Sequence, residues 1–481
     1  MALKEECGIA GIIGEKSAAR LVYLCLFAQQ HRGQEGCGIV SFEGQDTLYS
    51  APHSFKSFGL VADSFTPEVL DRLTGSSAIG HVRYSTHGGQ HLSNIQPFHF
   101  RTRLGPIAIA HNGNLTNGDI LRTELESTGS IFQSTSDTEV FVHLIARSKS
   151  DLIHERIFAA MNEARGAYSL VLLSQHHLYA VRDPHGFRPL VIGRKHGCYV
   201  IVSETCALDL IDAQFEREVE PGEVVCINEN GKLESFFPLT PRKPSFCSFE
   251  PIYFARPDSQ VFGSMVYHQR KMLGRILARE CPTTKGDIVI AVPDSGVPMA
   301  LGYSEESGIK FETGLVRNHY VGRTFIEPDQ EIRDFGVRLK LNPVPEILKG
   351  KNVVVVDDSL VRGTTAAKII RMIRNAGARH IHVRIGSPPI THSCFYGVDT
   401  PKRNQLLAAQ LDVDQIREFL GCDSLGYLSL QGLKQALEDG TDGGHFCLAC
   451  FNGAYPEETF VTQSSQPTDH KGPGLYAQKS L

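Results

Sequence analysis

The sequence predicts two domains in series, an α+β domain followed by a doubly wound α/β domain. Short apolar runs broken by glycine-rich turns fill the first half, as in the strands of an α+β domain; they are Cys7–Ile13, Ile107–Ala110, Tyr168–Leu173 and Cys198–Val202. Later runs are continuous and β-branched, as expected of parallel strands buried on both faces; they are Ile288–Val292, Val353–Val356 and Ile381–Ile385. The length of 481 residues fits this division, because one domain commonly holds roughly 100–200 residues.

Four prolines mark the expected connection between the two domains. They lie in a basic, polar segment, which favours a linker, at Pro238, Pro241, Pro244 and Pro251. In the second domain a helix that ends at Gly377 is expected from apolar residues at helical spacing; these are Ala366, Ile369, Ile370 and Ile373. A strand, loop, helix and strand in this order predict that ligands bind where the strands end. The last residues are polar and contain proline and glycine, which predicts a mobile tail.

Composition and charge exclude several classes of protein. Hydrophobic residues make up 41% and charged residues 21%, which is ordinary for a soluble globular protein. The net charge of −5 gives no general reason to expect nucleic acid or an anionic membrane as a partner. No stretch approaches the roughly 20 apolar residues that span a bilayer, and the start is too short and acidic for a targeting peptide. We therefore expect a cytoplasmic location, no nucleic-acid partner and no membrane partner.

The cysteines do not indicate a disulfide framework. Twelve of them occur in a long chain, whereas disulfide frameworks are typical of short secreted domains. In a reducing compartment the question becomes which cysteines bind metal and which one attacks a substrate.

The segment from Val353 to Thr365 is typical of a phosphate-binding loop. A buried strand delivers Asp357 and Asp358 to its exposed end, and a loop with Gly363 and two threonines then opens a helix. Backbone N–H groups and hydroxyls at a helix N-terminus suit a phosphate monoester. The two carboxylates would repel phosphate, so we expect them to face sugar hydroxyls and a hydrated Mg²⁺. A capped helix after an Asp turn is the alternative interpretation.

This segment resembles the ribose-phosphate signature of type I phosphoribosyltransferases. The resemblance implies that Asp357 and Asp358 bind the ribose hydroxyls and one Mg²⁺ per subunit. It implies that the following loop binds the 5′-phosphate through Arg362, Gly363, Thr364 and Thr365. A second loop is common turn chemistry by itself, but the resemblance implies that it binds pyrophosphate and that its serine reaches the metal; its residues are Asp294, Ser295 and Gly296.

A long basic loop lies between these two segments. A solvated face is its ordinary interpretation, but between two phosphate sites it resembles a lid that closes over the pyrophosphate and excludes water. Relatives often begin this loop with Lys-Asn-Arg-Tyr, whereas this chain has Arg317 and His319. The donor geometry therefore differs, and part of the charge depends on pH. The expected lid residues are Arg317, Tyr320, Arg323, Arg338 and Lys340.

Cys7 is the candidate nucleophile for hydrolysis of an amide. An arbitrary cysteine is expected to be an inert core residue, as we expect of Cys25 and Cys206. Four polar segments beside apolar runs change that expectation for Cys7; they are His31–Glu35, Gly80–Thr86, Ala110–Asn114 and Ser136–Glu139. They supply an arginine to grip the α-carboxylate of glutamine, an aspartate to hold its α-ammonium, and an oxyanion hole from Asn112 and the Gly113 N–H.

The nucleophile also needs a base, because a thiol attacks as the thiolate. No histidine is obviously assigned to that role. In N-terminal nucleophile hydrolases the α-amine of the chain itself serves. Cys7 gains a free amine only when residues 1–6 are removed, so we predict that the Glu6–Cys7 bond is cut by the protein itself.

These motifs, in this order, resemble the glutamine phosphoribosylpyrophosphate amidotransferase family over about residues 7–455. The resemblance implies a propeptide at 1–6, an N-terminal nucleophile hydrolase domain with a four-layer αββα fold at 7–240, a type I phosphoribosyltransferase domain with a cluster-binding C-terminal region at 250–455, and a mobile tail at 456–481. It implies that Arg83 and Asp137 bind glutamine, with Thr86 in support. Ammonia from glutamine would pass to 5-phosphoribosyl diphosphate, giving 5-phosphoribosylamine, pyrophosphate and glutamate in the committing step of purine synthesis.

The same resemblance implies AMP or GMP as feedback inhibitors and a homotetramer. Two other functions stay open. A glutamine-dependent transferase could give the ammonia to another acceptor, although the Asp357–Asp358 loop argues against it. A nucleotide-sensing regulator on an inactive fold would leave Cys7, Arg83 and Asn112 unexplained.

Four further cysteines form a candidate metal site. Cys447 and Cys450 make a CxxC pair, and by spacing alone zinc ranks first, ahead of an iron–sulfur cluster, a redox pair or no metal. The family resemblance reverses this order, since one branch, which also carries a short propeptide, has a [4Fe–4S] cluster on segments similar to those around Cys247, Cys394, Cys447 and Cys450. It implies one cluster per subunit with a structural role.

Overall fold

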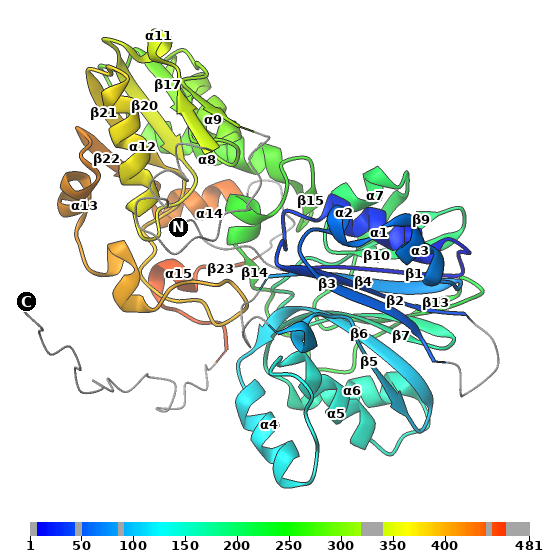
Figure 1. The fold of residues 1–481 in the computed structure, drawn as a ribbon. Coiled ribbons are helices and arrows are strands. Elements are labelled where there is room, and N and C mark those ends of the chain that lie inside the picture. Colours follow the sequence, from blue (N-terminus) through cyan, green and yellow to red (C-terminus); the bar gives the residue numbers. More distant parts are fainter. Residues whose placement is uncertain (1–6, 44–50, 85–90, 319–339, 439–444, 458–481) are drawn as a thin grey trace, which may run out of the picture.

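The computed structural model describes residues 7–43, 51–84, 91–318, 340–438 and 445–457. Its first half builds two antiparallel sheets that lie one above the other (Figure 1). The seven-stranded sheet has the order β11 (Gln214–Glu218), β9 (Val191–Lys195), β10 (Cys198–Val202), β1 (Gly8–Ile13), β4 (Ser77–Arg83), β2 (Gly36–Phe42) and β3 (His53–Phe58). The six-stranded sheet has the order β13 (Leu233–Phe236), β12 (Val224–Asn228), β8 (His177–Arg182), β7 (Gly166–Ser174), β6 (Gly105–Leu115) and β5 (Phe98–Thr102).

Helices cover the outer face of each sheet. The seven-stranded sheet is covered by α1 (Ala18–Ala28), α2 (Val61–Ser64), α3 (Pro67–Arg72) and α7 (Cys206–Leu210). The six-stranded sheet is covered by α4 (Gly118–Ser127), α5 (Thr138–Arg147) and α6 (Ile153–Glu163). The predicted four-layer αββα arrangement is therefore confirmed.

Strand β1 shows why the sequence builds these layers. Its side chains alternate between the two faces, as strand geometry requires: Ile9 and Ile13 lie in the core between the sheets, whereas Ala10 and Ile12 lie under the helices. All six residues of the strand are buried. An apolar run without polar alternation is the expected consequence of burial on both faces.

The second half forms a parallel sheet with helices on both faces. Its strand order is β17 (Ile288–Ala291), β20 (Asn352–Asp357), β21 (His380–Ile385) and β22 (Ser424–Tyr427). One face packs against α8 (Val266–Glu280), α9 (Val297–Ser307) and α14 (Leu430–Glu438). The other packs against α11 (Pro345–Leu348), α12 (Thr364–Asn375) and α13 (Val413–Leu420).

The three predicted strands and the predicted helix of this domain are all present. Val354 and Val356 point into one core and Val353 and Val355 into the other, so the β-branched run reflects burial on both faces. Strand β22 was not predicted. Its four residues include a glycine and are only half-buried, so it carries no apolar signal.

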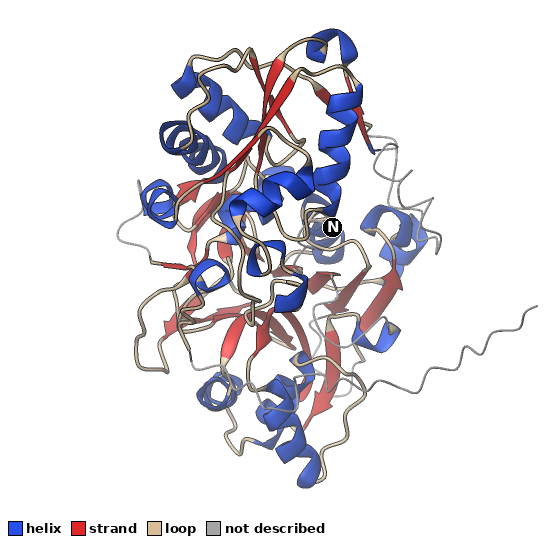
Figure 2. Cartoon of the chain, turned by 90° about the vertical axis from the view of Figure 1, so that its left-hand side faces the viewer, coloured by secondary structure: helices blue, strands red, loops and turns tan. Residues whose placement is uncertain are grey.

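Short elements complete the fold at the junction and the edges. They are η1 (Leu92–Asn94), the π-helix η2 (Glu250–Phe254), η3 (Arg403–Gln405), η4 (Leu407–Ala409), α15 (Ala449–Asn452), and the strand pairs β14 (Phe246–Cys247) with β23 (Phe446–Cys447), β15 (Gln260–Val261) with β16 (Ser264–Met265), and β18 (Leu315–Arg317) with β19 (Leu341–Pro343). Figure 2 shows the α/β domain above the two-sheet domain, with the junction loops between them. Within the residues that the structure describes, no helix has the length and apolar character needed to cross a membrane.

Candidate active sites

Cys7 immediately precedes strand β1 and is held by contacts from two directions. Its Sγ lies 3.6 Å from the backbone oxygen of Tyr84, and its own backbone oxygen accepts a hydrogen bond of 3.1 Å from Nε of Arg32. Strand β1 pairs with β4, with Gly8 opposite Val82. The thiol therefore lies beside the end of β4, the strand that carries Arg83.

Gly33 explains why the turn after Arg32 can approach β4 so closely. A Cβ atom at this position would lie 2.7 Å from the carbonyl carbons of both Val82 and Arg83. Only glycine permits this approach. The backbone of the predicted segment His31–Glu35 therefore packs directly against β4.

The two predicted oxyanion donors lie on strand β6, which packs against β1 and β4 of the facing sheet. Asn112 is 1% exposed, and its Nδ2 has no hydrogen-bond partner among the described residues. A buried unpaired donor costs about 1–3 kcal/mol, and an oxyanion would satisfy it. Gly113 has φ +149°, and a Cβ there would lie 2.1 Å from the oxygen of Ala167, so this position requires glycine.

The two predicted glutamine-binding side chains occupy the ends of elements around the same region. Arg83 is 4% exposed at the end of β4. Asp137 precedes α5 and accepts a 2.8 Å hydrogen bond from the Leu115 N–H through Oδ2, which ties it to the end of β6. The structure thus brings Cys7 close to Arg83, and Asp137 close to the oxyanion strand, while Thr86 lies outside the described residues.

Two buried histidines behind this site were not predicted from sequence. His111 bonds Oγ1 of Thr138 through Nδ1 at 3.0 Å, and burial lowers its pKa. His81, on β4, has no partner for either ring nitrogen among the described residues. Burial, together with the charge of Arg83, lowers the pKa of His81 to about 3. Burial therefore makes both rings weak bases.

Two other cysteines of the first domain behave as core residues. Cys25 and Cys206 are buried, and burial raises the pKa of the Cys25 thiol to about 12 and that of Cys206 further. A thiol with a raised pKa is a poor nucleophile near neutral pH. No disulfide is present among the described cysteines.

A second candidate site lies at the C-terminal ends of β17 and β20. Asp358 is 4% exposed; its Oδ2 accepts a hydrogen bond from Oγ of Ser295, and its Oδ1 accepts one of 2.5 Å from Oγ of Ser359. Burial raises the pKa of Asp357 and Asp358, and repulsion between the two carboxyls adds to the effect at Asp357. The buried Asp358 carboxyl, the half-buried Asp357 carboxyl and a serine hydroxyl are oxygen donors that suit a hard cation such as Mg²⁺.

Two glycines open the helices that face this site. Gly363 precedes α12 with φ +70°, and a Cβ there would lie 2.6 Å from Cδ2 of Leu407. Gly296 precedes α9, where a Cβ would lie 2.8 Å from the oxygen of Val292. Because each glycine lets the chain pass closely from a strand end into a helix, the backbone N–H groups of both helix N-termini lie at the strand ends. Arg362 donates a 2.9 Å hydrogen bond to Oε1 of Gln405.

The described part of the predicted lid is its base. Arg317 ends β18 and stands opposite Leu341 of β19, and the Asn318 N–H donates a 2.9 Å hydrogen bond to the oxygen of Lys340. Arg317 also forms an ion pair with Asp294 of the predicted pyrophosphate loop. Three predicted lid residues lie outside the described residues: Tyr320, Arg323 and Arg338.

The four cysteines predicted to bind a cluster lie side by side at the domain junction. Cys247 and Cys447 are opposite each other on the paired strands β14 and β23. The hydrogen bond with Cys450, aided by the charge of Arg188, lowers the pKa of the Cys394 thiol to about 6, whereas the pKa of Cys450 is raised. All three other thiols act on Cys450 electrostatically. Four adjoining thiols fit the donor set of an iron–sulfur cluster, although the described residues contain no group of three or more such side chains arranged as a metal site.

A buried network of charges at the same junction was also not predicted. It joins Arg32 and Glu204 of the first domain to Glu250 of the second, and all three side chains are 0% exposed. Burial alone would raise the pKa of Glu204, but the charges of His31 and Arg32 hold it below its ordinary value. No local pattern in the sequence marks these three charged residues as buried partners.

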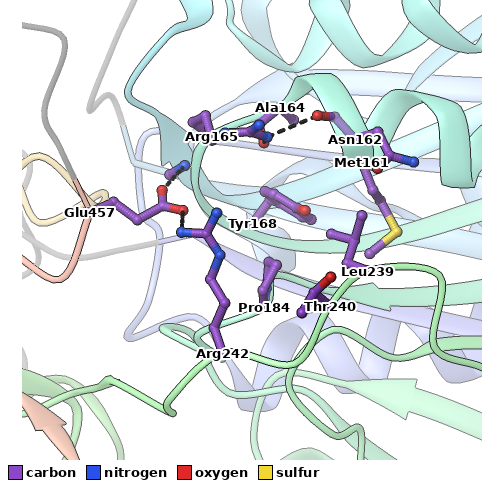
Figure 3. A pocket seen from close by; sticks show the side chains of 11 residues that line it. Met161, Asn162, Ala164, Arg165, Tyr168, Pro184, Leu239, Thr240, Arg242 and Glu457 are labelled. Atoms are coloured by element: carbon purple, nitrogen blue, oxygen red, sulfur yellow. Dashed lines mark hydrogen bonds and ion pairs between the residues drawn. The ribbon is translucent and has the colours of Figure 1, made fainter.

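A cavity of about 150 Å³ lies near the junction, and none of the predicted site residues lines it (Figure 3). Glu457 closes one side: Oε1 accepts 3.0 Å from Nη1 of Arg242, and Oε2 accepts 2.9 Å from the Gly166 N–H. Burial alone would raise the pKa of Glu457, but His185, 3.6 Å away, and these donors lower it. Burial alone would lower the pKa of His185, but Glu457 and a backbone hydrogen bond raise it.

Together, the two sheets with Cys7 and the parallel sheet with Asp357 and Asp358 define a glutamine amidotransferase joined to a phosphoribosyltransferase. Comparison with known proteins agrees. The model of the glutamine amidotransferase domain matches residues 81–209, and that of the phosphoribosyl transferase domain matches residues 265–386. The chain belongs to the amidophosphoribosyltransferase family.

Relatives of known name match nearly the whole chain. Amidophosphoribosyltransferase 2, chloroplastic, from Arabidopsis thaliana is 54% identical over 455 residues, covering 94% of this chain and 80% of that relative. The Bacillus subtilis amidophosphoribosyltransferase is 45% identical over 461 residues, covering 95% of both chains. The solved structure of the B. subtilis glutamine phosphoribosylpyrophosphate amidotransferase with ADP and GMP superposes with a TM-score of 0.88 at 44% identity, covering 95% of this chain and 98% of that one.

Proposed function

We propose that this chain hydrolyses glutamine at Cys7 and transfers the ammonia to 5-phosphoribosyl diphosphate. The products are 5-phosphoribosylamine, pyrophosphate and glutamate, the committing step of purine synthesis. The observation that carries the proposal is the presence, in one member of this family, of two donor sets. Cys7 lies beside the end of β4, with the buried Asn112 amide, which has no partner among the described residues, on the facing strand β6. Asp357 and Asp358 lie at the end of β20, with Ser295 bound to Asp358.

In the first half-reaction, the Cys7 thiolate attacks the glutamine amide carbon and ammonia leaves, which forms a glutamyl thioester on Cys7. Water then hydrolyses this thioester, releases glutamate and regenerates the thiol. Arg83 holds the α-carboxylate and Asp137 the α-ammonium of the substrate, with Thr86 in support. The Asn112 amide and the Gly113 N–H donate to the oxyanion of the tetrahedral intermediate. The α-amine of Cys7 takes the thiol proton once the Glu6–Cys7 bond is cut; sequencing of the mature amino terminus tests this, and an active enzyme that begins at Met1 would contradict it.

In the second half-reaction, ammonia attacks the anomeric carbon of the ribose and pyrophosphate leaves. Asp357 and Asp358 orient the ribose hydroxyls, while the loop from Arg362 to Thr365 binds the 5′-phosphate. Asp294, Ser295 and Gly296 bind the pyrophosphate. Mg²⁺, when held by Ser295, Asp357 and Asp358, neutralises negative charge on the diphosphate.

The lid residues exclude water from this centre when they close over the diphosphate. We propose this role for Arg317, Tyr320, Arg323, Arg338 and Lys340. Exclusion of water keeps ammonia unprotonated, so closure should precede cleavage of glutamine. The ion pair of Arg317 with Asp294 supports the role, because it joins the base of the lid to the pyrophosphate loop.

We propose that Cys247, Cys394, Cys447 and Cys450 hold one [4Fe–4S] cluster. These residues come from the junction, the second domain and the C-terminal region, so the cluster would join distant segments of the chain. When bound it supplies structural cross-linking, since the reaction needs no electron transfer. An anaerobic preparation that contains stoichiometric zinc and lacks the broad visible absorbance of such a cluster would contradict the assignment.

Several further properties stay predictions. We propose residues 7–240 and 250–455 as the two domains, 1–6 as the propeptide and 456–481 as the tail; limited proteolysis tests these bounds. The B. subtilis protein was solved with ADP and GMP, and we propose AMP or GMP as inhibitors here. Light scattering tests the homotetramer. Cell fractionation tests the cytoplasmic location, which the chloroplastic names of the plant relatives do not favour.

The decisive experiment incubates purified protein with glutamine, with and without 5-phosphoribosyl diphosphate. We expect glutamate formation that the second substrate stimulates, and release of pyrophosphate. Cys7→Ala should lose the use of glutamine and keep synthesis from added ammonia. Glutamate formation without pyrophosphate release would favour another acceptor, and the absence of both reactions would favour a regulator.

A further inference from the structure

Arg32 connects the backbone of Cys7 to the second domain through a buried ion pair. Its Nε donates to the Cys7 oxygen at 3.1 Å, while Nη1 and Nη2 donate to the two carboxylate oxygens of Glu250 at 3.0 and 2.7 Å. Both side chains are 0% exposed. A guanidinium bound on both nitrogens by one carboxylate has a fixed plane, so Glu250 fixes the direction in which Arg32 presents its Nε.

Glu250 belongs to the second domain and is itself held there. It is the first residue of the π-helix η2, and such helices are frequent at functional sites. Arg270, from α8, donates to the backbone oxygens of Pro251 and Ala255 at 2.8 Å each. The position of Glu250 is therefore set by the packing of the α/β domain.

The first domain also supplies an acidic and a basic side chain that contact the second domain at this junction. Glu204 forms an ion pair with Arg32 and accepts hydrogen bonds from the Arg256 N–H at 2.9 Å and from Oγ of Ser259 at 2.8 Å. Arg188 lies 3.5 Å from Glu250 and donates to the Tyr396 oxygen through Nη2 at 2.6 Å. Removing the Glu250 carboxylate would break the two-point contact with Arg32 and leave Glu204 to hold one side of its guanidinium, so that the guanidinium could reorient.

The carbonyl, the thiol side chain and the α-amine of Cys7 are all attached to one Cα atom, so the position of the carbonyl affects both reacting groups. Fixing this carbonyl restricts rotation about the Cα–C bond, and so limits the positions that the Cα atom, and with it the thiol and the α-amine, can take. A displacement of about 1 Å in a reacting group can cost roughly 100-fold in rate. The residue that orients Arg32 is thus in a position to control the rate at Cys7 without touching glutamine.

We propose that Glu250 is a positioning residue for glutamine hydrolysis, supplied to the glutaminase centre by the phosphoribosyltransferase domain. This inference rests on the proposed role of Cys7 as the nucleophile. The first domain alone contains Cys7, Arg83, Asn112 and Asp137, but the group that orients Arg32 comes from beyond the linker. The glutaminase centre is therefore complete only when the second domain is docked.

The test compares Glu250→Gln and Glu250→Asp in the full-length protein. We expect kcat for glutamine hydrolysis to fall roughly 100-fold in Glu250→Gln, with a smaller change in KM for glutamine, because the groups that bind glutamine are retained. Glu250→Asp keeps the charge and should recover part of the rate. Synthesis from added ammonia should be unchanged in both, which also shows that the second domain is folded.

Glu305→Gln is the matched control, because Glu305 also pairs with a cation, Lys271 at 2.5 Å, but on the surface. It should leave both activities unchanged. Retention of full glutamine hydrolysis by Glu250→Gln would overturn the inference, and so would an equal fall of both activities in both Glu250 variants, since that indicates a merely structural role. The proposed function fails separately, if Cys7→Ala still hydrolyses glutamine.

Discussion

The substitution Asn112→Ala tests whether the Asn112 side chain contributes to the rate of glutamine hydrolysis rather than to the stability of the fold. The Asn112 Nδ2 donor is buried and has no partner within the described residues. If it serves the oxyanion, its loss should lower kcat for glutamine hydrolysis by roughly 10²–10³-fold, or about 2.7–4 kcal/mol. Synthesis from added ammonia does not pass through this intermediate and should be unchanged.

The effect on stability should be small, because two contributions oppose each other. An unpaired buried donor destabilises the folded state by about 1–3 kcal/mol, and the substitution removes it. The same substitution also removes packing atoms from a buried position, which costs a comparable amount. We expect the net change to stay below about 1 kcal/mol, which corresponds to less than about 4 °C in Tm.

Asn117→Ala provides the matched control. Asn117 is also buried, but both ends of its amide have partners: Nδ2 donates to the Glu163 oxygen and Oδ1 accepts from the Arg165 N–H, each at 2.9 Å. This variant should lower Tm and leave kcat for glutamine unchanged. The assays are glutamate formation and thermal unfolding of both variants. An Asn112→Ala protein that unfolds as early as the control and still hydrolyses glutamine at the full rate would refute the reasoning.

Three further predictions concern other parts of the molecule. Gly113→Ala should lower both Tm and kcat for glutamine, because its Cβ would meet the Ala167 oxygen at 2.1 Å; an unchanged thermal scan would contradict this. Asp358→Asn should abolish the release of pyrophosphate from 5-phosphoribosyl diphosphate, whether glutamine or ammonia is the nitrogen donor. Retained synthesis from ammonia would exclude a role of Asp358 in binding that substrate. The pKa of Glu457 is lowered and that of His185 raised, so denaturant unfolding should show the largest loss for Glu457→Gln between about pH 4.5 and 6.5. That loss should shrink below this window as Glu457 protonates and above it as His185 deprotonates; a loss independent of pH would contradict the ion pair.

The fold was predictable wherever burial leaves a pattern in the sequence. Val353–Val356 and Cys7–Ile13 are continuous apolar runs because both faces of their strands are buried, and the structure confirms both strands. Strand β22 joins the sheet edge through its backbone, with Gly426 paired to Arg384. Since its side chains are half-buried, no periodicity marks it.

The candidate sites were predictable to the extent that their residues stand in local motifs. Asp357 ends a strand and Asp358 follows it, while Asn112 and Gly113 lie near the end of another strand, so neighbours in the sequence indicate the chemistry. The pairing of Arg32 with Glu250 spans 218 residues, and nothing local shows that either charge is buried. A charged residue in a sequence is normally a solvated one. Only the three-dimensional structure distinguishes the exceptions.

The buried pair of Arg32 and Glu250 also bears on how the glutaminase centre and the phosphoribosyltransferase centre can be coupled. Interfaces between domains are often polar and permit relative motion. Here, opening the junction would separate the buried Arg32 from Glu250. Arg270, which fixes the π-helix of Glu250, also acts on Asp358 of the second centre through its charge. The charge of Arg270 therefore reaches Asp358 while its hydrogen bonds hold the element that carries Glu250, so one side chain links the surroundings of both proposed centres.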